Sequence, residues 1–288
     1  MDIKKVLLGT DFSRPAVQLL DCLDEFQTLG LEEVVLVHVI DSRAKGAAMA
    51  YRGFEQEILE TQKKRLESLG LKVKVLTPVA IPNLELAKIA EKEHVSMILI
   101  SSHGQGIIKN IYLGSTTNDV IRVATVPVLI EKYRGIDTET CSIMCLNKFK
   151  KVLLPLDFSV HSRMLLNEIH TIAGLIDEVV LLTVIEGAYS DLELMLAMED
   201  REGLIDAAKI ELEQLGLKVK TMVRKGSAAN EILTVAEQED VTLVMLAKRG
   251  EGLIRELLMG STAHEVAKRS KRPVLLIPTV VQQPISDK

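Results

Sequence analysis

Aromatic and cationic side chains are both scarce in this sequence. Among 288 residues there are five phenylalanines, four tyrosines and no tryptophan, and 35 lysines and arginines stand against 40 aspartates and glutamates, for a net charge of −5. Nucleic-acid binders draw much of their affinity from cations placed on phosphates, and those that hold single strands stack the bases on aromatic rings. The composition therefore argues against a nucleic-acid partner.

Long apolar runs and a cysteine framework are also absent. The apolar core of MDIKKVLLGTDF at the N-terminus is far shorter than that of a signal peptide, and no run reaches the length of a membrane span. Three cysteines, Cys22, Cys141 and Cys145, are too few for a disulfide framework. Cys141 and Cys145 have no nearby histidine to complete a metal site, and their role is left open. We expect a cytoplasmic protein with no membrane partner and no metal-ligating residues.

What the sequence does contain is an internal repeat. IKKVLLGTDFS at 3–13 returns as FKKVLLPLDFS at 149–159, an offset of 146 residues, and LGLKVK at 69–74 returns at 215–220. With 47% apolar residues, the chain has enough material for two cores. The segment between the copies is polar and rich in turn-forming residues. We expect a first domain over 1–133, a linker over 134–148 and a second domain over 149–288.

Each copy alternates short runs of Val, Ile and Leu with longer segments of helical period. Near-continuous apolar strands separated by helices are typical of a parallel sheet covered on both faces. We therefore predict two tandem α/β domains, each a doubly wound sheet of five parallel strands. The expected strands of the first copy are Val6–Leu8, Val34–Ile40, Val73–Pro78, Met97–Ile100 and Val126–Glu131. The expected helices are Arg14–Leu29, Tyr51–Leu69, Leu84–His94 and Ser115–Ala124.

Two kinds of segment at strand carboxyl ends are candidates for ligand binding, because doubly wound sheets bind ligands at that edge. One is the glycine segment SSHGQGIIKNIYLGST at 101–116, where glycines admit a ligand and a helix N-terminus attracts anions. The alternative is that Ser115 and Ser261 merely cap helices. The second kind of segment is TDFS and its counterpart LDFS. Their aspartates, Asp11 and Asp157, either face a ligand or form the turn before a helix.

These features together resemble the universal stress protein domain. Nucleotide-binding members of that family carry a Gly, two residues, a second Gly, nine residues, and then Gly followed by Ser or Thr. The spacing recurs here over 101–115 and 247–261, with Ser101 and Ala247 in place of the first Gly. The resemblance covers almost the whole chain and implies the tandem form of the family, with a fold of the adenine nucleotide alpha hydrolase-like type.

The resemblance also implies a ligand and its contacts. Asp11 and Asp157 would lie against the adenosine, and the main chain of Val39 and Val184 would read the adenine. The implied ligand is ATP or AMP, with or without a magnesium ion. The glycine segments would hold its phosphates, and the full set of candidate binding residues is Thr10, Asp11, Val39, Ser101, Gly104, Gly114, Ser115, Thr116, Leu156, Asp157, Val184, Ala247, Gly250, Gly260, Ser261 and Thr262.

Charged residues in the glycine segments leave alternatives open. Lys248 and Arg249 lie either near the phosphates or in a solvated loop. His103 is not expected to be a general base, because the equivalent residue of the second copy is Arg249. No catalytic residues are assigned, since neither copy contains a complete nucleotide-hydrolase or dinucleotide motif.

The leading hypothesis is an adenine-nucleotide-binding stress-response regulator. The alternatives are a scaffold that does not bind nucleotide and holds a partner through its sheet edges and a Met-rich helix, and a slow ATP hydrolase. The family resemblance implies that the two copies pair through their final strands as an intramolecular pseudo-dimer. We expect two chains to associate further as a homodimer, with Ser190–Leu204 as a candidate contact surface.

Overall fold

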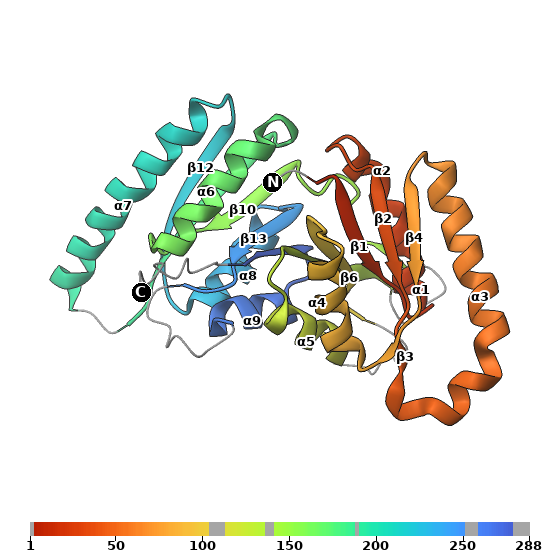
Figure 1. Cartoon of the computed structure of the whole chain (residues 1–288). Helices are drawn as coiled ribbons and strands as arrows, with labels where there is room; N and C mark the ends of the chain where they lie inside the picture. Colours follow the sequence, from red (N-terminus) through yellow and green to blue (C-terminus); the bar gives the residue numbers. More distant parts are fainter. Residues whose placement is uncertain (1–2, 104–112, 136–140, 188–189, 251–258, 279–288) are drawn as a thin grey trace, which may run out of the picture.

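The first repeat is a doubly wound sheet of five parallel strands. The computed structural model describes residues 3–103, 113–135, 141–187, 190–250 and 259–278. The strand order in the first repeat is β4-β2-β1-β6-β7, so the chain winds outward from β1 in one direction and then in the other (Figure 1). The strands are β1 (Lys5–Gly9), β2 (Glu33–Val37), β4 (Lys72–Leu76), β6 (Met97–Ser101) and β7 (Val128–Glu131).

The second repeat has the same topology. Its strand order, β12-β11-β10-β13-β14, matches that of the first repeat strand for strand. The predicted fold, two tandem doubly wound α/β units, is therefore confirmed. The strands are β10 (Lys151–Pro155), β11 (Glu178–Ile185), β12 (Lys218–Lys225), β13 (Leu243–Ala247) and β14 (Val274–Ile277).

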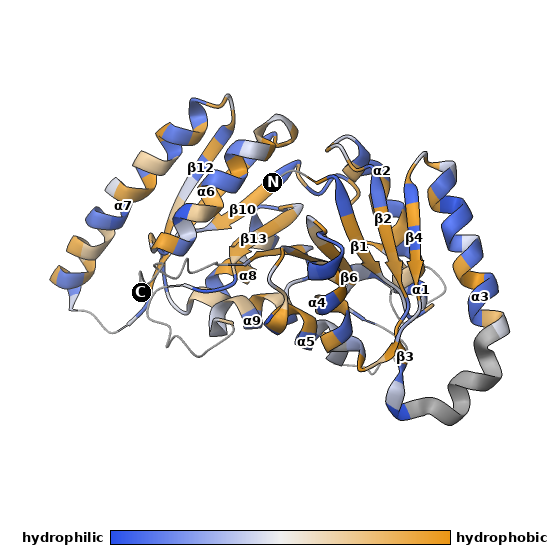
Figure 2. Cartoon of the chain, viewed as in Figure 1, coloured by the Kyte–Doolittle hydropathy of each residue, from blue (hydrophilic) through white to orange (hydrophobic). Residues whose placement is uncertain are grey.

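Helices cover both faces of each sheet. The apolar side chains of β1 alternate between the faces, with Val6 and Leu8 in one core cluster and Leu7 in the other. This double burial explains why the inner strands are apolar almost throughout, whereas the edge strands β4 and β12 begin by alternating lysine with valine (Figure 2). The helices of the first repeat are α1 (Arg14–Gln18), α2 (Leu23–Gln27), α3 (Lys45–Ser68), α4 (Pro82–Lys92) and α5 (Ser115–Val123). Those of the second are α6 (Val160–Ile172), α7 (Asp191–Glu213), α8 (Ala228–Gln238) and α9 (Ser261–Arg269).

The expectation of one continuous helix over Arg14–Leu29 was wrong. A 3-10 segment, Leu19–Cys22, separates α1 from α2, whereas the equivalent helix α6 is unbroken over thirteen residues. The 3-10 segment is buried at Leu19, Leu20 and Cys22, and the Cys22 Sγ donates to Glu131 Oε2 at 3.1 Å. Tertiary contacts with the end of β7 thus accompany the local change in helix type.

The two repeats pair through their last strands, as expected. β14 lies antiparallel to β7, with Leu275 opposite Leu129, and the two sheets become one sheet of ten strands. The linker adds a short antiparallel pair, β8 (Tyr133–Arg134) with β9 (Ser142–Ile143). Within the described residues, no helix is both long and apolar enough to cross a membrane.

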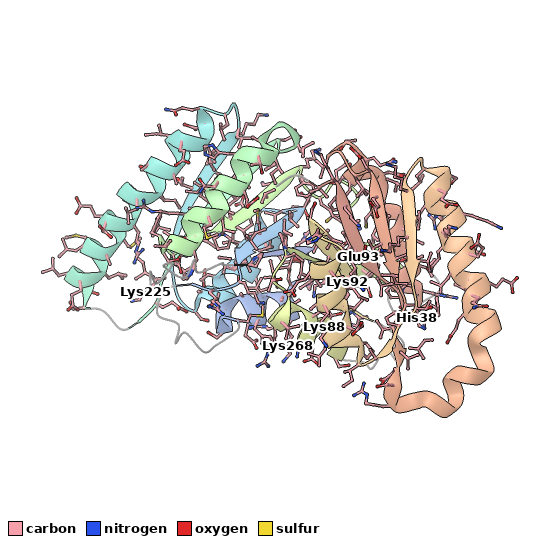
Figure 3. All side chains as sticks on the ribbon, in the orientation of Figure 1. His38, Lys88, Lys92, Glu93, Lys225 and Lys268 are labelled. Carbon is pink, nitrogen blue, oxygen red and sulfur yellow. The ribbon has the colours of Figure 1, made fainter. Side chains whose placement is uncertain are left out.

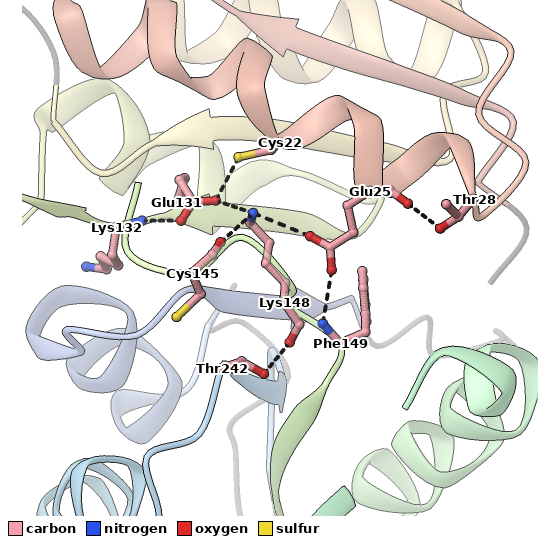
Figure 4. Close-up of polar contacts among 9 residues, drawn as sticks. All are labelled: Cys22, Glu25, Thr28, Glu131, Lys132, Cys145, Lys148, Phe149 and Thr242. Atoms are coloured by element: carbon pink, nitrogen blue, oxygen red, sulfur yellow. Dashed lines mark hydrogen bonds and ion pairs between the residues drawn. The ribbon is translucent and has the colours of Figure 1, made fainter. Parts of the chain in front are cut away.

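A buried ion pair joins the end of the linker to the end of β7 (Figure 4). Lys148 Nζ lies 3.0 Å from Glu131 Oε2, and both side chains are fully buried. Lys148 Nζ also donates to the Cys145 carbonyl at 3.0 Å and lies 3.6 Å from Glu25 Oε2. Burial alone would lower the pKa of Lys148, but the Glu131 carboxylate opposes burial and the pKa is raised. Lys148 therefore remains a cation inside the junction.

Helices α5 and α9 meet at the pseudo-twofold axis. His264 Nε2 donates to Asn118 Oδ1 at 2.7 Å, and these two residues are equivalent positions of the repeats. Lys132 Nζ donates to the Ala267 carbonyl at 2.9 Å, and Lys248 Nζ donates to the carbonyls of Arg122 and Ala124 at 2.6 and 2.9 Å. Each lysine thus binds near the C-terminal end of a helix of the other repeat, where carbonyls lack helical partners.

Candidate functional site

Each repeat has one pocket at the carboxyl ends of its strands. The first pocket, about 460 Å³, lies where β1, β2 and β6 end, beside the N-terminus of α5. The second pocket, about 410 Å³, lies where β10, β11 and β13 end, beside the N-terminus of α9. Both pockets include the position where the strand order reverses, between β1 and β6 and between β10 and β13. This is the part of a doubly wound sheet that favours ligand binding.

The aspartate of each TDFS or LDFS segment lines its pocket and also forms a turn. Asp11 Oδ1 accepts from the Ser13 N–H, and Asp157 Oδ1 accepts from the Ser159 N–H, both at 3.0 Å. Each serine is in turn the N-cap of the following helix. The turn-forming alternative is therefore confirmed, and it coexists with a position in the pocket wall.

The residue after each aspartate has a left-handed backbone. Phe12 has φ of 65° and Phe158 has φ of 60°, a conformation that costs an ordinary L-residue on the order of 1–2 kcal/mol. The same strained turn occurs in both repeats, directly at the pocket. The local hydrogen bonds of the aspartates hold these turns in place.

Glycines cap the helices that point at the pockets. Gly114 is the N-cap of α5 and Gly260 is the N-cap of α9, and neither helix has a side-chain cap hydrogen bond. The expectation that Gly-Ser begins a helix is confirmed, but Ser115 and Ser261 are not the N-caps, because both serines are the first helical residue. Without a side-chain oxygen at the cap, the first N–H groups of each helix and its positive dipole end suit an anion from the pocket.

The cap glycines are also tied to the strand ends. The Gly114 N–H donates to the Ser102 carbonyl at 2.7 Å, and the Gly260 N–H donates to the Lys248 carbonyl at 2.9 Å. In the first repeat, Thr117 Oγ1 donates to the Ser101 carbonyl at 2.7 Å. These bonds fix each helix N-terminus beside the carboxyl end of its strand.

Ser101 and Ala247 occupy the positions of the first family glycine without backbone strain. They are the last residues of β6 and β13. Neither is among the described non-glycine residues with positive φ, which are Phe12, His94, Phe158 and Asp240. The departure from glycine therefore requires no unusual backbone conformation at either position.

A stacked pair of rings forms one wall of the first pocket. Phe12 and His38 have ring centroids 4.2 Å apart and an interplanar angle of 30°. His38, labelled in Figure 3, places Nδ1 2.9 Å from the Thr10 carbonyl and Nε2 3.9 Å from Glu55 Oε1. Because the carbonyl accepts, Nδ1 carries a hydrogen. Asp41 also lines this pocket, and hydrogen bonds from the Arg43 side chain lower the pKa of its carboxyl group to about 2.

The second pocket has a glycine at which any side chain would force Asp157 to move. A Cβ added to Gly250 would lie 2.5 Å from Asp157 Oδ2, closer than real Cβ contacts come. Arg201, from α7, reaches into the same region, where its Nη1 donates to the Asp157 carbonyl at 3.2 Å and its guanidinium lies 5.6 Å from the Phe158 ring centroid. The strand end, the glycine segment and α7 thus converge on Asp157.

The structure brings together most of the predicted residues. The first pocket is lined by Thr10, Asp11, Val39, Ser101, Gly114, Ser115 and Thr116. The second is lined by Leu156, Asp157, Val184, Ala247, Gly250, Gly260, Ser261 and Thr262. Gly104 lies outside the described residues.

Lys248 differs from both of its expected settings. It is 8% exposed and binds carbonyls of the other repeat, so it lies neither in a solvated loop nor at the second pocket. Arg249 does line that pocket, and His103 lines the first one.

The sequence reasoning missed Phe12, His38, Glu55 and Arg201. Glu55 and Arg201 occupy equivalent positions of the repeats, 146 residues apart, but a Glu aligned with an Arg is not a repeated residue, and no signal in the sequence marked either one. Within the described residues, no group of three or more His, Cys, Asp or Glu side chains is placed to bind a metal ion.

Comparisons with known proteins define the family. The fold and paired pockets are those of a tandem α/β protein, and the model of the universal stress protein family matches residues 2–132 and 148–278. The chain belongs to the universal stress protein family, with one copy of the domain in each repeat.

Individual relatives agree with this assignment. Universal stress protein MJ0577 of Methanocaldococcus jannaschii is 39% identical over 156 residues, which are 46% of this chain and 96% of the relative. The crystal structure of a universal stress protein from Archaeoglobus fulgidus DSM 4304 aligns with a TM-score of 0.72 and 25% identity, over 97% of each chain. A functionally unknown protein of Pseudomonas aeruginosa PAO1, at 17% identity and a TM-score of 0.64 over 96% of this chain and 92% of that one, shares the fold.

Proposed function

We propose that this chain binds an adenine nucleotide, ATP or AMP, in both pockets and acts as a regulator. The observation that carries the proposal is the repeated pairing of a glycine-capped helix N-terminus with a pocket at the sheet's reversal point. Gly114, Ser115 and Thr116 hold phosphates in the first pocket, and Gly260, Ser261 and Thr262 do so in the second. Backbone N–H groups at a helix start are suited to this task.

The adenosine occupies the other end of each pocket. Asp11 and Asp157 accept hydrogen bonds from ribose hydroxyls, and the main chain at Val39 and Val184 reads the edge of the adenine. Val39 lies two residues after β2 and Val184 is the penultimate residue of β11, and each lines its pocket near the carboxyl end of the strand. Any magnesium ion enters with the phosphates.

Regulation is proposed rather than catalysis because the two pockets do not share an acid–base side chain in their glycine segments. His103 in the first corresponds to Arg249 in the second. A slow hydrolase remains the competing function, and phosphate release from ATP that depends on both cap glycines would favour it.

Calorimetric titration of the full chain with ATP and with AMP tests the proposal. Gly114 and Gly260 have φ of −63° and −73°, which any residue adopts, so Gly114→Val and Gly260→Val obstruct the helix N-termini without backbone strain. We expect each variant to lose one of two sites. Gly174→Val is the matched control, because Gly174 is exposed and its added Cβ would meet nothing within 4 Å. Unchanged binding in both pocket variants would contradict the proposal.

We further propose that two chains associate through the start of α7. Leu192, Met195 and Leu196 lie three and four residues apart and are 62%, 57% and 54% exposed. Side chains at this spacing share one helix face, and covering that face removes apolar surface from water. Sedimentation of the wild type as a dimer and of Leu196→Glu as a monomer would support this contact. A monomeric wild type would contradict it and favour a different partner.

A further inference from the structure

The two pockets carry opposite charges at equivalent positions. Glu55 of α3 and Arg201 of α7 are separated by the repeat offset, and each lines its own pocket. A second pair of equivalent residues, His103 and Arg249, differs in that only the arginine is permanently charged. At both positions the second pocket has a permanent cation where the first has none.

The second pocket holds two arginines whose guanidinium groups form no salt bridge with the described carboxylates. Arg201 interacts with a backbone carbonyl and an aromatic ring, both of which hold the guanidinium in place without cancelling its charge. Among the described residues, neither Arg201 nor Arg249 forms an ion pair. Two acidic residues, Asp157 and Glu186, also line this pocket, so its described charges are balanced before a ligand enters.

The first pocket is acidic by comparison. Three carboxylates, those of Asp11, Asp41 and Glu55, are among its described lining residues; Asp41 is paired with Arg43 at 2.6 Å, which leaves Asp11 and Glu55 as the other acidic groups of the wall. Glu55 lies 3.9 Å from His38, the ring of which stacks on Phe12. A negative ligand group that approaches this wall meets a carboxylate instead of a guanidinium.

We propose that the two pockets select adenine ligands of different charge. The second pocket takes a nucleoside triphosphate, with Arg201 and Arg249 as the specificity-determining residues. The first takes adenosine or its monophosphate, with Glu55 disfavouring additional phosphates. This inference rests on the proposed nucleotide binding and adds to it a division of ligands between the repeats.

The chemistry of the two ligand classes fits this division. A triphosphate carries several negative charges, and a guanidinium pairs with phosphate oxygens through parallel N–H donors. Charge reversal at one position changes the interaction with each phosphate from attractive to repulsive, an effect that grows with phosphate number and falls with salt. Adenosine has no such charge and is insensitive to the exchange.

The test uses single-site forms of the full chain. Calorimetry measures ATP, AMP and adenosine binding to Gly114→Val, which retains the second pocket, and to Gly260→Val, which retains the first. We expect the second pocket to bind ATP about tenfold or more tightly than adenosine, and the first pocket to show the reverse order. In the second pocket, Arg201→Glu should weaken ATP binding by about tenfold and leave adenosine binding within about threefold, whereas Arg201→Lys should retain ATP binding. In the first pocket, Glu55→Arg should strengthen ATP binding.

The outcomes separate the two proposals. The same order of ligand preference in both pockets, or an Arg201→Glu variant with a native melting temperature and unchanged ATP affinity, would overturn the division of ligands while nucleotide binding stood. A failure of all three ligands to bind any form would overturn both proposals. If Arg201→Glu does not fold, Arg201→Lys and the response of ATP affinity to salt replace it. Salt should weaken ATP binding in the second pocket, and salt-independent binding would overturn the role of the arginines.

Discussion

Removal of the Lys148 cation should strongly destabilise the junction between the repeats. Lys148→Met keeps the aliphatic length of the side chain but leaves Glu131 buried without its cation, which lies 3.0 Å away in the native protein. Breaking a fully buried ion pair by truncating one partner typically costs about 3–5 kcal/mol. Glu131 retains a hydrogen bond from Cys22 Sγ and one from the Lys132 N–H, so we expect a loss near the lower end of that range.

The loss of folding stability in Lys148→Met should also depend on pH, and the direction of that dependence identifies its cause. Burial already raises the pKa of Glu131 above 4.5, and loss of Lys148 should raise it further. An acid with a raised folded-state pKa is destabilising above its unfolded pKa, so the variant should lose stability relative to wild type as pH rises from about 5 to 8. Lys148→Met/Glu131→Gln removes the buried charge and should recover part of the loss.

Urea unfolding followed by circular dichroism measures these changes. Lys150→Met, at an exposed neighbouring position, is the matched control and should change the free energy of unfolding by less than about 0.5 kcal/mol. A loss below about 1 kcal/mol in Lys148→Met, or one that does not vary between pH 5 and 8, would refute the view that a buried charge pair joins the linker to β7.

Two further predictions concern the second pocket and the lysine at the pseudo-twofold axis. Gly250→Ala should weaken nucleotide binding to the second pocket by about tenfold, because the new Cβ displaces Asp157, and should leave the first pocket unaffected. Calorimetry on the Gly114→Val background measures the affinity of the second pocket alone. Burial lowers the pKa of Lys132 from 10.5 to about 7. The cost in folding stability of burying its charged ammonium group is therefore fully present below pH 7 and disappears as pH rises toward 10.5. The stability of wild type relative to Lys132→Met should therefore rise by roughly 1.4 kcal/mol per pH unit within that window, as measured by urea unfolding; a flat difference would contradict the shift.

The fold was predictable because its signals are local and repeated. Short apolar runs such as Met97–Ile100, which became β6, alternate with helical segments, and the offset of 146 residues showed the same order twice. The position of the pockets then followed from the rule for doubly wound sheets. Asp11 and Gly114 could be placed at one pocket because each follows a strand that ends at the same edge.

Features that depend on long-range packing could not be predicted. Lys248 is adjacent to the glycine segment in sequence, yet its ammonium group lies against carbonyls 124 and 126 residues away, in the other repeat. Lys148 belongs to a segment whose polar sequence predicts an exposed linker, but the pairing of β14 with β7 and the fold of the linker bury it beside Glu131. Glu55 gave no local signal, because only the path of α3 over the sheet brings it to the first pocket.

The measurement that tests nucleotide binding most directly is mass spectrometry of the small molecules released when the freshly purified protein is denatured. We expect an adenine nucleotide at about one or two molecules per chain, reduced in Gly114→Val or Gly260→Val and unchanged in Gly174→Val. Absence of released nucleotide, together with no rise in melting temperature on addition of ATP or AMP, would contradict the proposed nucleotide binding.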